Sequence, residues 1–153
     1  MPYPITIESL IPHRDRMKLI DEIVDITDHS AITRTTVSSR LPLYRDGHVD
    51  SLIIIEIVAQ TAAVHVSWRK DTAGKAGGGL LAGVKSADFF MEWVPLQTIL
   101  TTTVKPLYSA DGYTVLEGTV QAEKDLVGRV EIQVIRFEEE PQPDREGVFK
   151  EGV

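Results

Sequence analysis

The sequence predicts an α+β domain in which an antiparallel sheet wraps around one long helix, and two observations lead to this prediction. The first is a segment, residues 50–70, whose composition suits a buried helix. The second is a series of runs rich in β-branched residues on both sides of that segment, separated by turn residues. One buried helix among strands that follow one another through short turns is typical of an α+β arrangement.

The helix is expected from the way that residues 50–70 begin and end. The segment has a capping residue at Asp50 or Ser51, three alanines in its middle, and the basic pair Arg69 and Lys70 at its end. Hydroxyl or acidic residues at the start and cations in the last turn suit a helix and its dipole. Because the segment is apolar on nearly all sides, we expect the helix to be buried rather than laid on a surface.

Strands are expected on both sides of this helix. The predicted strand segments are residues 17–27, 31–38, 97–105, 113–122 and the alternating run 129–134. Asp111-Gly112 and Lys124-Asp125 are expected to form hairpin turns. The glycine-containing stretch 71–79 is expected to be a loop.

Length and composition set the domain organisation. The chain of 153 residues suits a single domain over residues 1–137. Residues 138–153 are charged, contain proline and have few apolar groups to bury, so we interpret them as a solvated tail. The longest apolar stretch, residues 52–66, is too short and too polar to span a bilayer, and the N-terminal residues lack a secretory pattern, so a cytoplasmic protein is expected.

Charge and residue usage exclude several kinds of function. The net charge of −7 argues against nucleic-acid binding, and it also works against docking an acidic carrier protein unless the sixteen basic residues cluster. The absence of cysteine excludes disulfides, thiolate metal sites and a cysteine nucleophile. No spacing of histidines suggests a metal site. No phosphate loop or serine nucleophile motif is present.

Glu56 is the residue that most needs a chemical explanation. It lies in the most apolar stretch of the chain, residues 52–59. An isolated buried carboxylate is very costly, so Glu56 should be paired, protonated or open to a functional cavity. Desolvation would let it hold a proton near neutrality, as a general acid requires, and Gln60 lies one turn further on the same face. A surface glutamate on a partly covered helix is the equally weighted alternative.

His48 lies just before the predicted helix. A neutral imidazole near a carboxylic acid makes a pair suited to proton abstraction and leaving-group protonation. The alternative, which the sequence alone favours, is an exposed loop histidine. His13, His29 and His65 are interpreted as structural or exposed.

Three segments together resemble the 3-hydroxyacyl-carrier-protein dehydratases of the FabZ/FabA type. Residues 11–21, IPHRDRMKLID, are similar to that family's L-P-H-R-x-P-x-L-L-V-D opening. Gly47-His48 and residues 52–60, LIIIEIVAQ, are similar to its G-H-F and V-L-x-x-E-x-x-A-Q motifs. Residues 83–95, GVKSADFFMEWVP, are similar to its G-I-x-x-A-R-F and V-x-P-G motifs. The order and approximate spacing agree over residues 5–137.

The resemblance implies a hot-dog fold, a dimer, and an active site whose histidine and acid come from different protomers. Carried over by position, His48 would abstract the α-proton of a 3-hydroxyacyl thioester on acyl carrier protein or CoA. Glu56 would protonate the departing hydroxyl, giving a trans-2-enoyl thioester without a cofactor. Backbone N–H groups at the helix start would face the thioester carbonyl. The implied substrate-binding residues are Ser51, Leu52, Gln60 and Phe89.

The chain also departs from the family pattern. His48 and Glu56 are only eight positions apart, because the proline-rich segment that precedes the helix in the family is missing. The basic pair that follows Phe89 in the family is also replaced. The shortened loop resembles the branch encoded with aryl-polyene-type lipid clusters, in which a subunit can work beside a second hot-dog partner. Two other functions therefore stay open: a hot-dog acyl thioesterase, and a non-catalytic subunit that completes a heterodimer.

Overall fold

The computed structural model describes residues 5–72 and 78–137, and the statements below refer to these residues. Two 3-10 turns come first, η1 (Ile7–Ser9) and η2 (Asp15–Met17). Four short strands follow: β1 (Glu22–Ile26), β2 (Ala31–Thr36), β3 (Tyr44–Arg45) and β4 (His48–Asp50). They lead to the helix α1 (Ile53–Thr72). The last strands are β5 (Gly78–Phe89), β6 (Trp93–Pro95), β7 (Ile99–Ala110), β8 (Tyr113–Ala122) and β9 (Asp125–Phe137).

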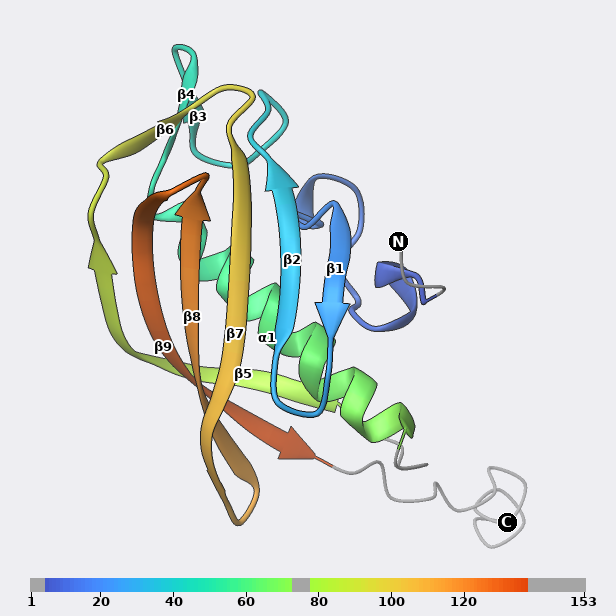
Figure 1. Cartoon of the computed structure of the whole chain (residues 1–153). Coiled ribbons are helices and arrows are strands. Elements are labelled where there is room, and N and C mark those ends of the chain that lie inside the picture. The colour runs from blue at the N-terminus through green and yellow to red at the C-terminus, as the bar shows by residue number, and fades with distance from the viewer. Residues whose placement is uncertain (1–4, 73–77, 138–153) are drawn as a thin grey trace, which may run out of the picture.

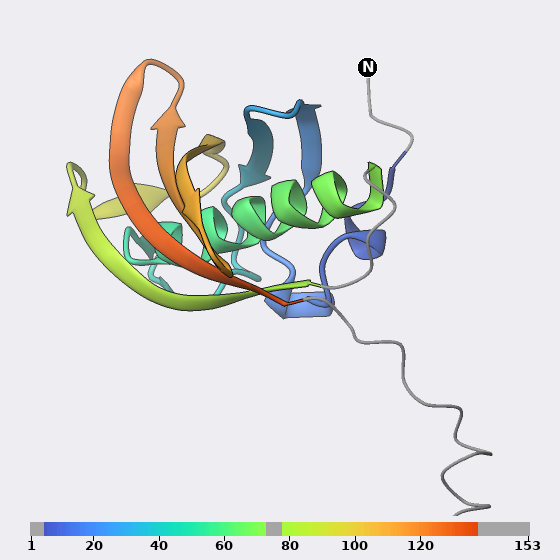
Figure 2. The same cartoon turned by 90° about the horizontal axis from the view of Figure 1, so that it is seen from below.

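Six of these strands form one antiparallel sheet in the order β1-β2-β7-β8-β9-β5. The sheet curls around α1, as the two views in Figures 1 and 2 show. A smaller sheet in the order β3-β4-β6 lies near the start of the helix (Figure 1). The predicted α+β architecture, with the sheet wrapped around one long helix, is therefore confirmed.

The core lies between α1 and the inner face of the sheet. Ile54, Ile57 and Val58 of the helix are fully buried in a single apolar cluster with residues from both ends of the sheet. Two sheet glycines allow the helix to come close: a side chain at Gly118 would collide with Val58, and one at Gly128 would collide with Ile54. The helix is thus buried as predicted, and its depth is set by residues that lack a side chain.

The helix and the turns agree with the sequence to within a few residues. The helix begins at Ile53 rather than Asp50, because Asp50 still belongs to β4. The Asp50 carboxylate accepts a hydrogen bond from the Leu52 N–H at 2.9 Å just before the helix, so the predicted capping residue does bind a backbone donor there. The β7–β8 turn contains Gly112 at φ 81°, and the β8–β9 turn contains Glu123 at φ 56°.

Other boundaries were wrong. The loop expected over residues 71–79 is shorter: residues 71–72 continue α1, while Gly78 and Gly79 begin β5, where they pair with β9. Pairing in a sheet can place glycines in a strand that their own propensity would not favour. The strand expected from Met17 begins at Glu22, because residues 15–17 form a 3-10 turn. β5 and β6 were not predicted as strands.

Two further points concern the limits of the fold. The predicted tail, residues 138–153, lies outside the described residues, as do residues 73–77 in the predicted loop. Among the helices that the structure describes, none has the length and apolar character needed to cross a membrane.

Candidate active site

Glu56 lies in the first turn of α1, on the side of the helix that the sheet covers incompletely. Ile55, Ala59 and Ala63, one turn apart on the neighbouring stripe, are also only half-buried. The side chain of Glu56 is 37% exposed. The carboxylate therefore opens to the surface of the single chain, although the helix around it is mostly buried.

Two nitrogen atoms converge on one oxygen of this carboxylate. Gln60 donates from Nε2 to Oε1 of Glu56 at 3.0 Å. The Nε2 atom of His13 lies 3.3 Å from the same Oε1. Glu56 is thus paired, which is one of the three states expected from its apolar surroundings. Its partner is His13, for which the sequence predicts a structural or exposed role.

Gln60 is fully buried, and backbone groups determine its orientation. Its Oε1 accepts a hydrogen bond from the Leu19 N–H at 2.9 Å, and its Nε2 donates to the Met17 carbonyl at 2.7 Å. Because the Leu19 N–H can only donate, the amide oxygen must face it, and the amide nitrogen then faces Glu56. Gln60 therefore joins residues 17–19 to the helix while holding the carboxylate. Its substrate-binding role stays a prediction.

His13 lies in a segment whose backbone is held by hydrogen bonds from Arg14. The Arg14 guanidinium donates to the carbonyl oxygens of Ile11 at 2.6 Å, His13 at 2.8 Å and Glu8 at 2.8 Å. The His13 side chain is 29% exposed, but its Nδ1 is buried and has no hydrogen-bond partner among the described residues. One ring nitrogen thus faces Glu56, and the other makes no hydrogen bond with any described residue.

His48 lies elsewhere, on β4. Its ring packs against Trp93 of β6, with ring centroids 5.0 Å apart and planes tilted by 44°. Within the described residues of one chain, the polar contacts of Glu56 come from His13 and Gln60 and not from His48. A pair between His48 and Glu56 of two different subunits stays a prediction.

The other predicted substrate-binding residues surround the helix start and the end of β5. Ser51 is buried, and its Oγ has no hydrogen-bond partner in the described part of the chain. The Ser51 N–H donates to the Glu92 carbonyl at 3.1 Å, and the Leu52 N–H donates to Asp50. The side chains of Leu52 and Phe89 are exposed. Two of the backbone donors expected to face a thioester carbonyl are therefore engaged within the chain.

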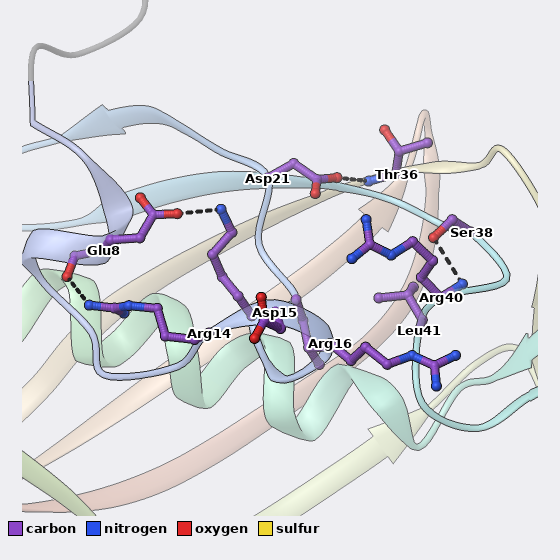
Figure 3. Close-up of a pocket in the computed structure, with 11 residues that line it drawn as sticks. Glu8, Arg14, Asp15, Arg16, Asp21, Thr36, Ser38, Arg40 and Leu41 are labelled. Carbon is purple, nitrogen blue, oxygen red and sulfur yellow. Dashed lines mark hydrogen bonds and ion pairs between the residues drawn. The ribbon is translucent and has the colours of Figure 1, made fainter.

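A cavity of about 370 Å³ adjoins the segment that carries His13 (Figure 3). It is lined by residues of both charges, namely Glu8, Arg14, Asp15, Arg16, Lys18, Asp21 and Arg40, together with Leu19, Thr36, Ser38 and Leu41. Lys18 binds Glu8 at 2.6 Å, and this hydrogen bond lowers the pKa of the Glu8 carboxyl. Asp21 accepts a hydrogen bond from the Thr36 N–H at 2.7 Å.

Two arginines of this cavity differ from the third, because their guanidinium groups have no partner among the described residues. The guanidinium groups of Arg16 and Arg40 make no hydrogen bond or ion pair with any residue that the structure describes, whereas that of Arg14 donates to three backbone carbonyls. Figure 3 shows both side chains near Leu41. No group of three or more His, Asp or Glu side chains in residues 5–72 and 78–137 is arranged to hold a metal ion.

A long helix inside a curled antiparallel sheet, with a carboxylate at the open side of its first turn, defines a hot-dog protein with a candidate acid–base site. Comparison with protein families makes the assignment more specific. The family described as ApeP-like, ApeP dehydratase, matches residues 5–144. The chain belongs to this family of dehydratases.

Individual proteins agree with the family. The chain is 31% identical over 138 residues to a 3-hydroxyacyl-[acyl-carrier-protein] dehydratase FabZ of Cereibacter sphaeroides, covering 82% of this chain and 88% of that protein. The predicted resemblance to FabZ-type dehydratases is therefore confirmed, and the chain is a dehydratase, a lyase.

Solved structures confirm the hot-dog fold. The dehydratase heterocomplex ApeI:P from Xenorhabdus doucetiae matches with a TM-score of 0.77 at 19% identity, covering 98% of this chain and 96% of that chain. A hypothetical thioesterase with coenzyme A from Streptococcus pneumoniae matches with a TM-score of 0.61 at 16% identity, covering 76% and 85%. At this identity the likeness to a thioesterase concerns the fold, so it supports the thioesterase alternative only weakly.

The position of His13 beside Glu56 was not predicted from the sequence. A signal for it was present, because His13 stands in the first of the three segments that resemble the dehydratase family, and Glu56 stands in the second. The structure brings these two segments together, because Gln60 of the second binds the backbone of Met17 and Leu19 in the first. Two motifs far apart in the sequence therefore form one site.

Proposed function

We propose that the chain dehydrates 3-hydroxyacyl groups carried as thioesters on acyl carrier protein, in the synthesis of fatty-acid-like or polyene lipids. The observation that carries this proposal is the Glu56 carboxylate, held by His13 and Gln60 at the open side of a buried helix. A carboxyl group that is held in one place and remains accessible is suited to deliver a proton to a leaving hydroxyl. The name of the Cereibacter sphaeroides relative supports the substrate class.

The reaction needs one base and one acid. The His48 imidazole takes the proton from C2 of the acyl chain, and the electrons of that C–H bond form the C2–C3 double bond. The C3–O bond breaks, and Glu56 gives its proton to the departing hydroxyl, which leaves as water. The proton on His48 returns to Glu56 before the next turnover, so the balance is one water lost and no cofactor consumed.

A second hot-dog subunit brings its His48, or an equivalent base, to Glu56 in this proposal. β5 is an outer strand of the six-stranded sheet, and its apolar side chains Leu81, Val84 and Phe89 are 40%, 44% and 39% exposed. A long apolar edge strand favours pairing with another chain. The half-buried stripe beside Glu56 offers a second surface. The ApeI:P heterocomplex supports a different hot-dog subunit as the partner, with a second copy of this chain as the alternative.

The charge of the chain fits an acidic carrier only if basic residues gather at one place. Four of them line the cavity of Figure 3 together with the three carboxylates Glu8, Asp15 and Asp21, and Arg16 and Arg40 are the two whose guanidinium groups stay unengaged in the described residues. We place the carrier at this surface, because complementary charge steers association and fixes orientation. Arg16→Glu with Arg40→Glu should raise the KM for a carrier-bound substrate and leave that for a short pantetheine thioester unchanged. An equal change in both would contradict this placement.

The test of the reaction uses the purified chain with a 3-hydroxyacyl carrier substrate, alone and together with a second hot-dog subunit. Mass spectrometry of the acyl group measures water loss, and a thiol reagent measures hydrolysis. Glu56→Gln should lower turnover by about 10²- to 10⁴-fold, the usual contribution of general acid–base catalysis, and His48→Ala should do the same where two copies of this chain share the site. Their thermal unfolding midpoints should stay unchanged. Full turnover by both variants would refute the catalytic assignment, and thiol release without water loss would favour a thioesterase.

Mixing the two variants tests where the partner residue comes from. If two copies of this chain share a site, Glu56→Gln and His48→Ala chains mixed after unfolding and refolding should regain activity, because some dimers contain one intact site. If a different hot-dog subunit supplies the base, the mixture stays inactive, and activity depends on that subunit.

A further inference from the structure

The two oxygen atoms of Glu56 have different surroundings. Oε1 is approached by Nε2 of Gln60 at 3.0 Å and by Nε2 of His13 at 3.3 Å, whereas no described residue forms a hydrogen bond or ion pair with Oε2. An oxygen that accepts one N–H group and has a ring nitrogen 3.3 Å away is a poor place for a proton, because its own O–H would be directed at those nitrogens. The proton of the carboxyl group therefore belongs on Oε2.

The protonation state of His13 follows from its second ring nitrogen. Nδ1 is buried and has no hydrogen-bond partner among the described residues. In the cation, or in the tautomer protonated at Nδ1, this atom would be a buried donor without an acceptor, which is unfavourable. In the neutral tautomer protonated at Nε2, the donor lies 3.3 Å from Oε1 of Glu56 and only the lone pair of Nδ1 remains without a partner. The geometry favours this last form.

We propose that His13 is a positioning residue for the dehydration: as a neutral imidazole it donates from Nε2 to Oε1 of Glu56 and, with Gln60, leaves Oε2 to carry and deliver the proton. This inference rests on the proposed role of Glu56 as the acid.

Two donors are needed because the last torsion of a glutamate side chain is broad and has no sharp minimum. With Gln60 as the single donor, the carboxyl group of Glu56 can still rotate about its Cγ–Cδ bond. A second donor from a different segment restricts this rotation.

The segment of His13 is rigid enough to impose this restriction. Arg14 fastens it at one end through three backbone carbonyls, and Gln60 fastens it at the other through Met17 and Leu19. The backbone of His13 therefore cannot move away from Glu56 without breaking hydrogen bonds on both sides. Side chains locked by such surrounding bonds are the ones that hold a catalytic group in its productive geometry.

Two substitutions test whether His13 acts through its N–H donor or through the shape of its ring. His13→Phe keeps the ring but removes the N–H, and His13→Gln places an amide nitrogen near the position of Nε2. With the active protein and a 3-hydroxyacyl carrier substrate, His13→Phe should lower kcat by about 10- to 100-fold, the loss that a small misplacement of a reacting group produces, with KM unchanged. His13→Gln should restore most of kcat. His29→Phe, an exposed histidine, is the matched control and should have no effect.

Nitrogen-15 NMR of the histidine rings tests the tautomer independently of activity. The expected result for the full chain at neutral pH is a protonated Nε2 and an unprotonated Nδ1 at His13, with the signals assigned by their loss in His13→Gln. A cation, or a proton on Nδ1, would overturn the inference, as would a His13→Phe variant with wild-type kcat.

Turnover of Glu56→Gln and His13→Phe distinguishes the role of His13 from the proposed function of the site. If Glu56→Gln keeps its turnover, the proposed dehydration site is wrong. If Glu56→Gln is inactive while His13→Phe is fully active, only the proposed role of His13 is wrong.

Discussion

The helix α1 carries two polar clusters that differ in how completely their groups are satisfied. Near its start, Glu56 is 37% exposed, and one of its oxygens has no partner among the described residues. Nine positions later His65 is only 1% exposed, and its Nε2 binds the Thr27 carbonyl at 2.9 Å. Next to it, the Thr61 and Thr33 hydroxyls bind each other at 2.8 Å.

The difference separates groups that stabilise the fold from groups available for chemistry. Burial lowers the pKa of His65, so this histidine is neutral at physiological pH and its hydrogen bond ties the helix to the β1–β2 hairpin. A buried polar group that is fully paired contributes to folding and has no capacity left for a substrate. Glu56 retains capacity because it lies at the open side of the helix. We therefore expect substitutions in the two clusters to change different properties.

The largest effect is expected at Gln60, because this residue both stabilises the fold and holds the Glu56 carboxylate. Gln60→Leu would leave the buried Leu19 N–H and the Met17 carbonyl without partners, so the free energy of unfolding should fall by about 2–5 kcal/mol. It would also release Oε1 of Glu56, so kcat should fall in the protein that remains folded. Urea unfolding and turnover of the same preparation measure the two changes. A loss of only one property would show that Gln60 does not serve both the stability of the fold and the reaction.

His65→Ala should have the next largest effect, on stability alone. The substitution opens a cavity in the core and removes the donor from the Thr27 carbonyl, so the free energy of unfolding should fall by about 2–4 kcal/mol. The kcat of the folded protein should be unchanged, measured below the temperature at which the variant unfolds. The exposed His29→Ala is the control, and a drop in kcat for His65→Ala would break the distinction between the two clusters.

Thr61→Val should have a smaller effect of the same kind. Valine has a similar shape but leaves the buried Thr33 hydroxyl without its partner at 2.8 Å, which should cost about 1–2 kcal/mol of unfolding free energy. Exchanging both residues, Thr33→Val with Thr61→Val, should recover part of this loss because no unpaired hydroxyl remains. A double-mutant cycle in urea measures the coupling between the two positions.

The smallest effect is a pH dependence of stability from His65. Its pKa in the folded chain lies below the ordinary value of 6.5, so between these two pH values the unfolded chain binds more protons. Stability from this residue is therefore present above pH 6.5 and is lost as the pH falls, with a slope of at most about 1.4 kcal/mol per pH unit. Unfolding curves of the wild type and His65→Gln above and below this pH give the difference. Equal slopes for the two proteins would contradict the prediction.

Much of the fold followed from local patterns. The apolar composition of residues 50–70 predicted the buried helix, and the alternation in residues 113–122 and 129–134 predicted β8 and the core of β9. β5 was missed because residues 78–89 begin with glycines and show no regular alternation of apolar and polar residues, so their pattern does not resemble that of a half-buried strand. Pairing with β9 along its length makes it a strand.

For the site, the sequence identified Glu56 and Gln60 as a pair on one helix face, which needs only the helical period. It also pointed to the dehydratase family, because three motifs stand in the right order. These determinations depend on residue types and spacing alone. Only the tertiary structure decided that His13 meets Glu56 and that one carboxylate oxygen stays open. That contact joins residues far apart in the chain. Its geometry depends on the hydrogen bonds that Gln60 and Arg14 make to the backbone of the segment that carries His13.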